Sequence, residues 1–475
     1  MKKLFISSYL LICVLPVFSQ VDPQNSYGKL SSYSEITNYT LAPAGDNFLF
    51  VADELSLFNV SSFVPVTVNS TNYSVQNFTS AIISTSLDYK IFTLDIIPTA
   101  GKTYTSCGYI LYDQGRKKVA FIAMYSSTLQ LIGLKTYPGI ERFNAIVQDN
   151  GILPINKKPR LYVCGRNELC NIKSEGVILG LEFDGSVVWK KVLEPNKKYD
   201  DYFEFNNLIS SGLKDNFLYV VGSGISGKSA KKDVLISVLK RDGSELLTQM
   251  IGRPNTKSIE IIDKGFSIDI TERGEIIIGG STQEREYSSG QCSEDILIMK
   301  LKPDLSLLQL NFLWAKKYDL GGNTDEKIRS LCLTEKQIYF SGYTKGNVRN
   351  PNFSYDAFIF PTDFDGNGNE ARIYGSDGDE FLYSCFVKKD NESVVSGGYT
   401  NRFNNKYPEI AAPYIVEFQN PLKEFCELSI IRVEPSNIDC KIIGMELSSK
   451  RNRTIIYETE PLETNIKQNK ICIDF

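Results

Sequence analysis

Four oxygen-bearing side chains in residues 363–369 have the alternating spacing of a calcium-binding loop. They are Asp363, Asp365, Asn367 and Asn369, in the stretch DFDGNGN. Oxygen ligands at every second position of a twelve-residue loop converge on one hard cation, and the twelfth residue normally adds a bidentate carboxylate. That position is Tyr374 in this chain. The stretch therefore predicts at most a weak calcium site, and the sequence requires no other cofactor.

Two acidic pairs, Asp325 with Glu326 and Asp379 with Glu380, stand in links between apolar runs. Near the mouth of a channel, such carboxylates would attract cations or basic partners. They would equally serve as turn residues that cap the ends of strands. Paired carboxylates also meet the needs of a glycosidase, although no motif selects a catalytic pair here. An extracellular carboxylate-dependent hydrolase is therefore the alternative hypothesis for function.

The chain contains no histidine. This excludes Ser-His-Asp triads, Cys-His pairs, zinc or copper held by His, and haem with a His ligand, because each needs an imidazole. A net charge of −4 argues against nucleic acid as a partner.

Arginines and tyrosines in or beside long polar segments are candidates for ligand contacts. These residue types are frequent interface anchors, and aromatic faces also stack on sugars. The alternative is a solvated rim whose aromatic side chains pack locally. Together with the acidic pairs, the candidate ligand-binding residues are Arg285, Tyr343, Arg349, Tyr399, Arg402, Asp325, Glu326, Asp379 and Glu380.

The first 19 residues predict a secretory signal. Lys2 and Lys3 precede an apolar run, and compact residues at Val17 and Ser19 suit cleavage after Ser19. No later run approaches the roughly 20 apolar residues that span a bilayer. We therefore expect a secreted, extracellular protein without an integral membrane segment.

An exported chain is expected to carry disulfides and sugars. Cys13 lies in the signal, which leaves an odd number of the ten cysteines in the mature chain. Cys164 and Cys170 flank one polar segment and form the predicted local disulfide, while the odd cysteine would stay free or bridge to another chain. Sequons for N-glycosylation begin at Asn38, Asn59, Asn69, Asn72, Asn77, Asn352, Asn391 and Asn452.

These side chains are positioned by an internal repeat. An apolar run that ends in glycine recurs about every 57 residues, at Gly108, Gly165, Gly222, Gly280, Gly342 and Gly398. Each unit holds four apolar runs of strand length that are separated by Gly, Asn and Asp, which predicts one four-stranded antiparallel sheet per repeat. The predicted units are approximately 34–84, 89–138, 142–193, 204–251, 265–318, 326–375 and 380–432.

Repeated four-stranded sheets of this length predict an all-β protein, a β-propeller in which each blade packs against its neighbours. Seven blades are expected, with six or eight as alternatives. We expect the signal in 1–19, a lead-in or closure strand in 20–33, and the propeller in 34–432. Residues 433–475 would form a C-terminal β-element that closes the propeller or begins an extra blade.

One combination of stretches resembles the SBBP-type β-propeller repeat family. It joins DAFIF at residue 356, the DFDGN turn, RIYGSDGDEFLYS and VVSGGYT, and similar stretches recur from about 160 to 400. The resemblance implies a propeller in an exported or surface protein and transfers no catalytic residues, because the family carries no general reaction. Kelch repeats are the runner-up, on IIIGG and VVSGG, but the aromatic positions expected after these doublets are not maintained.

The strand order divides the loops between two faces of such a propeller. Loops between the second and third strands are long and irregular, and they share a face with the links that lead into the next blade. Long loops on a rigid scaffold are the usual place for binding. We therefore expect a non-catalytic binding, adhesion or coat module for protein or glycan ligands.

Overall fold

The computed structural model is all-β in the part of the chain that it describes. No helix there is long and apolar enough to cross a membrane. Side chains are described only between residues 91 and 418. Of the 475 residues, the structure describes 25–26, 34–44, 47–56, 61–69, 75–78, 81–84, 90–99, 103–112, 117–149, 161–170, 173–194, 202–211, 217–225, 231–253, 259–286, 292–321, 325–345, 354–368, 370–375, 378–388, 393–400, 412–418, 428–432, 436–437 and 441–443.

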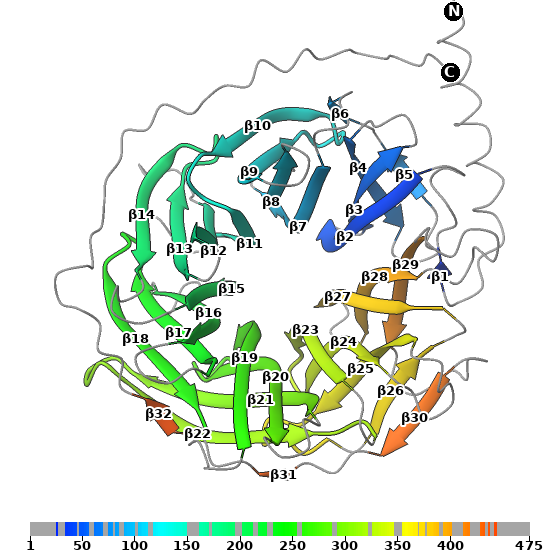
Figure 1. Ribbon diagram of the computed structural model, residues 1–475. Helices are drawn as coiled ribbons and strands as arrows, with labels where there is room; N and C mark the ends of the chain where they lie inside the picture. Colours follow the sequence, from blue (N-terminus) through cyan, green and yellow to red (C-terminus); the bar gives the residue numbers. More distant parts are fainter. Residues whose placement is uncertain are drawn as a thin grey trace, which may run out of the picture.

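Consecutive strands pair antiparallel into groups that follow the sequence repeat. Within a group we call the strands a to d, counted outward from the centre of the molecule (Figure 1). The first groups are β2 (Ser34–Ala44), β3 (Asn47–Ser56), β4 (Ser61–Asn69), β5 (Val75–Phe78) and β6 (Ala81–Ser84); β7 (Lys90–Thr99), β8 (Thr103–Tyr112), β9 (Lys117–Tyr125) and β10 (Leu131–Tyr137); and β11 (Arg142–Gln148), β12 (Leu161–Cys170), β13 (Lys173–Leu181) and β14 (Val187–Leu193). The later groups are β15 (Tyr202–Ser210), β16 (Phe217–Ile225), β17 (Asp233–Lys240) and β18 (Glu245–Gly252); β19 (Ile259–Ile270), β20 (Ile276–Glu286), β21 (Cys292–Asp304) and β22 (Gln309–Tyr318); β23 (Asp325–Leu333), β24 (Ile338–Lys345), β25 (Tyr355–Thr362) and β26 (Glu370–Tyr374); and β27 (Glu380–Val387), β28 (Val394–Thr400) and β29 (Ala412–Phe418).

The groups are arranged in a ring around the inner strands, as in a β-propeller (Figure 1). Each inner strand contacts the next one around the ring, and β27 contacts β2, so the last group lies beside the first. The short strand β1 (Asn25–Ser26) pairs antiparallel with β29. The sheet order β1-β29-β28-β27 makes the N-terminal lead-in the outermost strand of the last group. The two ends of the repeat region are therefore joined by a shared sheet.

The C-terminal strands do not form a blade of their own. β30 (Leu428–Arg432) pairs with β26, β31 (Ser436–Asn437) with β22, and β32 (Lys441–Ile443) with β18. Each therefore adds to the outer edge of an existing sheet, and the three sheets are reached in the reverse of their order in the chain (Figure 1). Strand β30 lies in the predicted unit 380–432 but pairs with β26 of the preceding unit, while β31 and β32 cover outer strands that would otherwise present unpaired backbone groups. The rest of 433–475, where a closing element or an extra blade is expected, lies outside the described residues.

The hydrophobic core lies between neighbouring sheets. One cluster joins Val221 and Ile236 of one sheet to Ile278 and Met299 of the next, all 0–1% exposed. Strand β17 is buried at every position except its last residue, Lys240. Both faces of a middle strand are covered, which is why the sequence shows unbroken apolar runs there instead of alternation. Each fully buried aliphatic side chain contributes about 1.5–3 kcal/mol.

The repeat glycines follow from a bulge in strand a. The register between strands a and b shifts at the same place in successive groups, for example between Phe143 and Ala145 in β11 and between Ile328 and Ser330 in β23. The bulge brings a strand-a carbonyl against strand b. A Cβ on Gly342 would lie 1.8 Å from the carbonyl oxygen of Lys327. Only glycine fits at this position, which explains the marker that defines the repeat.

Candidate functional site

The starts of strands a and c and the ends of strands b and d share one face of the propeller. We call it the b–c face. Among the predicted ligand-binding residues, Asp325, Glu326, Asp379 and Glu380 lie at or just before the starts of β23 and β27. Tyr343 and Tyr399 lie near the ends of β24 and β28, and Arg285 near the end of β20. Arg349 and Arg402 lie outside the described residues.

The structure brings two of these residues together in an aromatic cluster on the b–c face. The ring centroids of Phe381 lie 4.8 Å from Tyr343, 4.9 Å from Tyr355 and 4.7 Å from Tyr399. Tyr383 stacks on Tyr399 at 5.9 Å. Centroid spacings of this size are the favourable range for aromatic pairs. We define the aromatic cluster as Arg329, Tyr343, Tyr355, Phe381, Tyr383 and Tyr399.

Arg329 adds a positive charge to the aromatic cluster. Its guanidinium carbon lies 5.5 Å from the ring centroids of Phe266, Tyr343 and Tyr383 alike. It also donates a hydrogen bond of 3.3 Å to the hydroxyl of Tyr343. Cation–π contacts at such distances contribute about 0.5–1 kcal/mol each when partly exposed. The guanidinium is therefore held in place by rings and stays only half-buried.

Two tyrosine hydroxyls of the aromatic cluster, those of Tyr383 and Tyr399, are held neutral by burial. Burial raises the pKa of Tyr383 and of Tyr399 above the ordinary value for tyrosine, and the two phenols also interact with one another. Tyr343 is 7% exposed, whereas Tyr355, Tyr383 and Tyr399 keep part of their surface accessible. The cluster thus presents aromatic faces and neutral hydroxyls beside one guanidinium.

The predicted acidic residues bond to the ends of strands. Glu326 is 0% exposed and accepts a hydrogen bond of 3.2 Å from the Thr344 hydroxyl, and Glu380 accepts one of 2.9 Å from Thr400. Asp379 accepts the backbone N–H of Tyr355 at 2.9 Å. In the same way, the carboxylate of Asp325 accepts the N–H of Glu294 at 3.2 Å. These contacts match the strand-capping alternative.

One acidic group on this face has oxygens close enough to hold a cation. Carboxylate oxygens of Asp295, Asp319 and Glu326 lie within 4.8 Å of one another. Lys317 approaches Asp295 at 2.9 Å and supplies a positive charge. Burial raises the pKa of Asp295 in spite of this lysine. Only Glu326 was predicted from the sequence, since Asp295 on β21 and Asp319, just after β22, belong to the preceding repeat.

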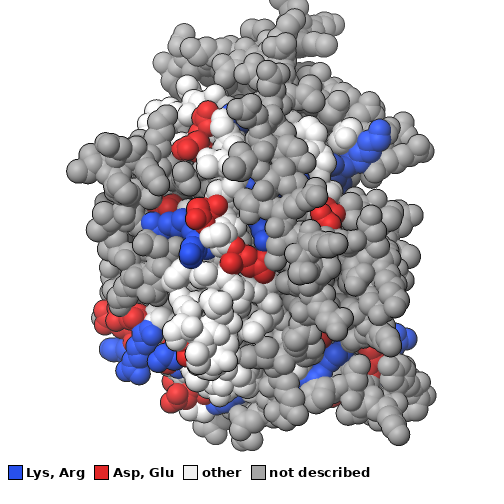
Figure 2. Space-filling view, turned by 90° about the vertical axis from the view of Figure 1, so that its left-hand side faces the viewer, with Lys and Arg blue, Asp and Glu red and all other residues white. Residues whose placement is uncertain are grey.

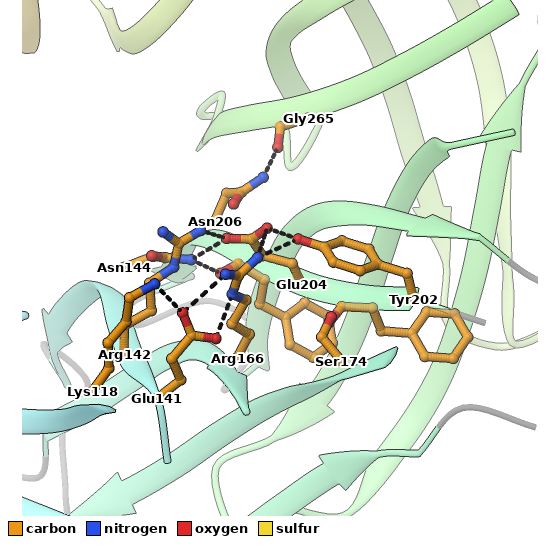
Figure 3. Close-up of polar contacts among 12 residues, drawn as sticks. Lys118, Glu141, Arg142, Asn144, Arg166, Ser174, Tyr202, Glu204, Asn206 and Gly265 are labelled. Carbon is orange, nitrogen blue, oxygen red and sulfur yellow. Dashed lines mark hydrogen bonds and ion pairs between the residues drawn. The ribbon is translucent and has the colours of Figure 1, made fainter. Parts of the chain in front are cut away.

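A second constellation on the b–c face is a charged cluster that joins three groups of strands (Figure 3). Arg166 donates two hydrogen bonds to Glu141, from Nε at 2.8 Å and from Nη2 at 2.9 Å, and Lys118 donates to the same carboxylate at 3.0 Å. On its other side Arg166 reaches Glu204 at 3.6 Å and donates to the Tyr202 hydroxyl at 2.7 Å. Arg166 therefore connects β11 with β15.

Glu204 is bonded to three other side chains of the charged cluster. It accepts hydrogen bonds from Arg142 and Tyr202, and from Asn144 Nδ2 at 3.1 Å. Burial opposes its charge, but the guanidiniums of Arg142 and Arg166 bring its pKa down to about 2. Burial, with the charge of Glu204, raises the pKa of Tyr202 to about 12. With these pKa values, neither Glu204 nor Tyr202 exchanges a proton near neutral pH. The hydrogen bonds of the charged cluster instead connect neighbouring strands.

Surface charge of the two signs is mixed on the side of the molecule shown in Figure 2. Acidic and basic side chains of the described residues lie next to one another there, with uncharged surface between them. Among the described residues on this side, charges of one sign form no extended field of the kind that attracts a polyanion.

The predicted calcium loop is a hairpin turn between strands c and d. Gly366 has φ +72°, as Gly185 (+79°) and Gly243 (+84°) have in the equivalent turns. The Asp363 carboxylate accepts the N–H of Asp365 at 2.9 Å and both the N–H and the side-chain amide of Asn367, at 2.7 and 3.0 Å. Lys316 donates to the Asn367 side-chain oxygen at 2.8 Å. These oxygens bond within the protein, Asn369 lies outside the described residues, and calcium binding stays a prediction.

The predicted disulfide between Cys164 and Cys170 is wrong. Cys164 carries a free, buried thiol. Both residues belong to β12, where six residues at about 3.3 Å each separate them by roughly 20 Å. The sequence analysis had placed them on either side of a loop, whereas the strand continues through both. Of the sequons, Asn59, Asn72, Asn352, Asn391 and Asn452 lie outside the described residues, and Asn38, Asn69 and Asn77 lie on β2, β4 and β5, whose side chains are not described.

Sequence reasoning missed Arg329, Phe381 and Tyr383 because they lie on strand a, outside the long segments between strands b and c, and it also missed Tyr355 at the start of strand c. Arg329 and Tyr383 are the extra residues at the strand-a bulges of β23 and β27. A usable signal exists one residue after the repeat glycines, where successive repeats carry Tyr109, Arg166, Ser223, Ser281, Tyr343 and Tyr399. The position is aromatic in β8, β24 and β28, charged in β12 and a serine in β16 and β20, so the aromatic cluster and the charged cluster differ at this position.

No protein-family model and no curated protein sequence matches the chain. Among solved structures, it is similar to the β-propeller domain of the Trilobed protease from Pyrococcus furiosus, at 10% identity and TM-score 0.43, covering 82% of this chain and 98% of that one. It is also similar to the WD40 domain of SCAP from fission yeast, at 8% identity and TM-score 0.36, covering 81% and 95%. A glycoside hydrolase matches at 10% identity and TM-score 0.29, covering 73% and 93%. The propeller assignment rests on the strand arrangement itself.

Proposed function

We propose that the protein is a secreted, non-catalytic binding module, a seven-bladed β-propeller of the SBBP repeat type that holds a protein or glycan ligand on its b–c face. The contact surface is the aromatic cluster around Arg329. Supporting the seven-bladed arrangement, β27 contacts β2 and β1 adds to the sheet of β29. Supporting the repeat type, Asp233 and Asp356 lie at or next to the first position of strand c and pack against the glycines Gly252 and Gly375.

One observation carries the proposal. Phe381, Tyr383 and Tyr399 from one sheet meet Tyr343, Tyr355 and Arg329 from the neighbouring sheet, through ring contacts of 4.7–6.2 Å. Tyrosine supplies a large contact area with few rotatable bonds, and Tyr and Arg are enriched among the residues that dominate binding energy. The rings are already packed, so a ligand would not have to order them.

The chemistry of the cluster favours a ligand with apolar faces and hydroxyl or carbonyl groups. The half-buried rings of Tyr383 and Tyr399 can stack on the C–H face of a sugar or on a peptide side chain, while their neutral hydroxyls donate or accept hydrogen bonds. The Arg329 guanidinium would bond to an acceptor oxygen of the ligand.

The test begins with a screen of the purified full chain against a glycan array and a panel of extracellular proteins. For the ligands found, Tyr399→Ala and Tyr383→Ala are each expected to weaken binding by at least about tenfold. The matched control is Tyr109→Ala, which removes a ring stacked on Phe92 at 4.6 Å in another sheet. Equal weakening by the control variant, in proteins with unchanged thermal unfolding, would remove the aromatic cluster from the proposal.

The same preparation also tests the hydrolase alternative. A panel of glycosides and esters is incubated with the wild-type chain and with Asp325→Asn and Asp379→Asn. Both carboxylates accept backbone hydrogen bonds, so we expect no turnover that depends on them. Turnover that disappears in either variant would replace the binding proposal with a catalytic one.

A further inference from the structure

Two free cysteines from neighbouring sheets meet beside the inner strands β23 and β27. Cys332 lies opposite Tyr339 in the pairing of β23 with β24. The Cys385 thiol, on β27, donates to the carbonyl oxygen of that same Tyr339 at 3.9 Å. The backbone N–H of Cys385 also donates to the Ser330 hydroxyl of β23 at 3.1 Å. Cys385 is thus held against the segment of β23 that carries Cys332.

Cys332 belongs to the hydrophobic cluster between these sheets, and Cys385 packs against that same cluster. The Cys385 thiol is near enough to Cys332 to contribute to the raised pKa of the Cys332 thiol. Cys332 is 6% exposed, while Cys385 is only half-buried. A disulfide needs two facing side chains whose Cα atoms lie about 4.4–6.8 Å apart, a spacing that strands of adjacent sheets in direct contact can provide. Reaching a sulfur–sulfur bond from this contact requires side-chain rotation of the thiols.

We propose that Cys332 and Cys385 form a disulfide that joins the inner strands of two neighbouring blades. The oxidant is a low-molecular-weight disulfide. The Cys385 thiolate attacks one sulfur of that disulfide and releases one small thiol, which takes up a proton. The Cys332 thiolate then attacks Cys385 in the mixed disulfide and releases the second small thiol. Two protein thiols are oxidised, and one small disulfide is reduced to two thiols.

The order of attack follows from exposure. Burial, together with the neighbouring Cys385 thiol, raises the pKa of the Cys332 thiol well above its ordinary value. The half-buried Cys385 is therefore the sulfur that meets the oxidant first, and Cys332 reacts as the resolving thiol from within the core. The disulfide would connect β23 with β27 and close a covalent loop that contains every residue between the two cysteines.

Peptide mapping of the full chain tests the proposal. The native protein is incubated with oxidised glutathione, unfolded without reduction, alkylated and digested with trypsin. Cleavage after Arg329, Lys336, Arg372 and Lys388 would release residues 330–336 and 373–388 as one cross-linked species, two hydrogens lighter than the separate peptides together. Reduction should return both peptides and lower the thermal unfolding midpoint of the protein by several degrees.

Control variants separate this bond from other thiol chemistry. Cys332→Ser must abolish the cross-linked species, whereas Cys107→Ser, which changes another fully buried free thiol, must leave it intact. Recovery of both wild-type peptides as alkylated free thiols after the glutathione treatment would overturn the proposal. A cross-link from Cys332 or Cys385 to any other cysteine would overturn it as well.

Discussion

At the scale of single residues, the repeat glycine of strand b lies so close to the backbone of strand a that no other residue fits there. The carbonyl of the bulged strand a lies so close that a Cβ on Gly342 or Gly398 would overlap it, at 1.8 and 1.7 Å. The obstacle is backbone, so it cannot rotate away as a side chain would. The bulge in strand a therefore explains why glycine recurs at a regular spacing in the sequence.

We expect Gly342→Ala to destabilise the protein by about 3 kcal/mol or more, because the bulge must open to admit one methyl group. The matched control is Gly133→Ala in β10, where the added Cβ would meet only the flexible end of Met124. That change should cost less than about 1 kcal/mol. Urea unfolding of the two variants measures the difference, and equal stabilities would contradict the close approach.

The same bulges decide which side chains form the candidate site. Arg329 and Tyr383 occupy the extra position, where the chain turns a residue out of the regular alternation. A strand pattern read from the sequence assigns such residues to the wrong face, since alternation breaks at a bulge. Tyr343 and Tyr399 could be predicted because they adjoin the long segments between strands b and c, whereas the bulges hid Arg329 and Tyr383.

At the scale of elements, the C-terminal strands cover the outer edges of three sheets. The edges of β18, β22 and β26 would otherwise present unpaired N–H and C=O groups. β30 makes the longest of these pairings, with five residues opposite β26. Each pairing is short, so the strands contribute less to the core than to the protection of these edges.

Deletion of residues 428–475 is expected to leave a folded ring that associates with itself through the exposed edges. Size-exclusion chromatography with light scattering would show a shift to oligomers, with a lower temperature for the onset of aggregation. The control is deletion of 444–475, which keeps β30, β31 and β32. If the longer deletion remained monomeric to the same temperature as the control, edge protection would not be the role of these strands.

At the scale of the whole molecule, buried carboxylates make stability depend on pH. Burial raises the pKa of Asp95 to about 7, and that of Asp233 and Asp269 to about 6, each from an ordinary 3.8. Asp95 accepts the N–H of Ile146 at 2.9 Å from the next inner strand, so it lies at a junction between sheets. The chain has no histidine, and these carboxylates of the described residues titrate between about pH 5 and pH 8 in its place.

The sign of the effect follows from the raised pKa values. In the unfolded chain these carboxyls ionise near pH 4, while in the folded protein they hold their protons until about pH 6–7. The unfolded state therefore loses protons first, and stability falls as the pH rises through this window. We expect the free energy of unfolding to fall by on the order of 1–3 kcal/mol between about pH 5 and pH 8.

Urea unfolding across that pH range measures this dependence. Asp95→Asn should flatten it, because an amide cannot ionise. Glu204→Gln serves as the control, since Glu204 has a pKa of about 2 and its own contribution is lost only below about pH 4.5. A wild-type protein that became more stable toward pH 8 would contradict the raised pKa values.

By itself, the sequence determined the all-β class and the positions of most strands. Apolar runs of strand length, their Gly and Asp turns and the regular glycines are local properties, and a repeat shows them several times over. The turn at Asp363 could also be placed by its phase, beside the turns at Gly185 and Gly243. Local chemistry was sufficient for each of these features.

Only the tertiary structure decided which side chains meet. The aromatic cluster joins residues 329–399 from two sheets, the charged cluster joins Lys118 to Glu204, and the C-terminal strands pair with β26, β22 and β18. These contacts depend on the ring bringing distant segments side by side and on bulges that reverse the alternation of strand a. Cys164 and Cys170, by contrast, are close in the sequence but lie roughly 20 Å apart, because the strand β12 holds the segment between them extended.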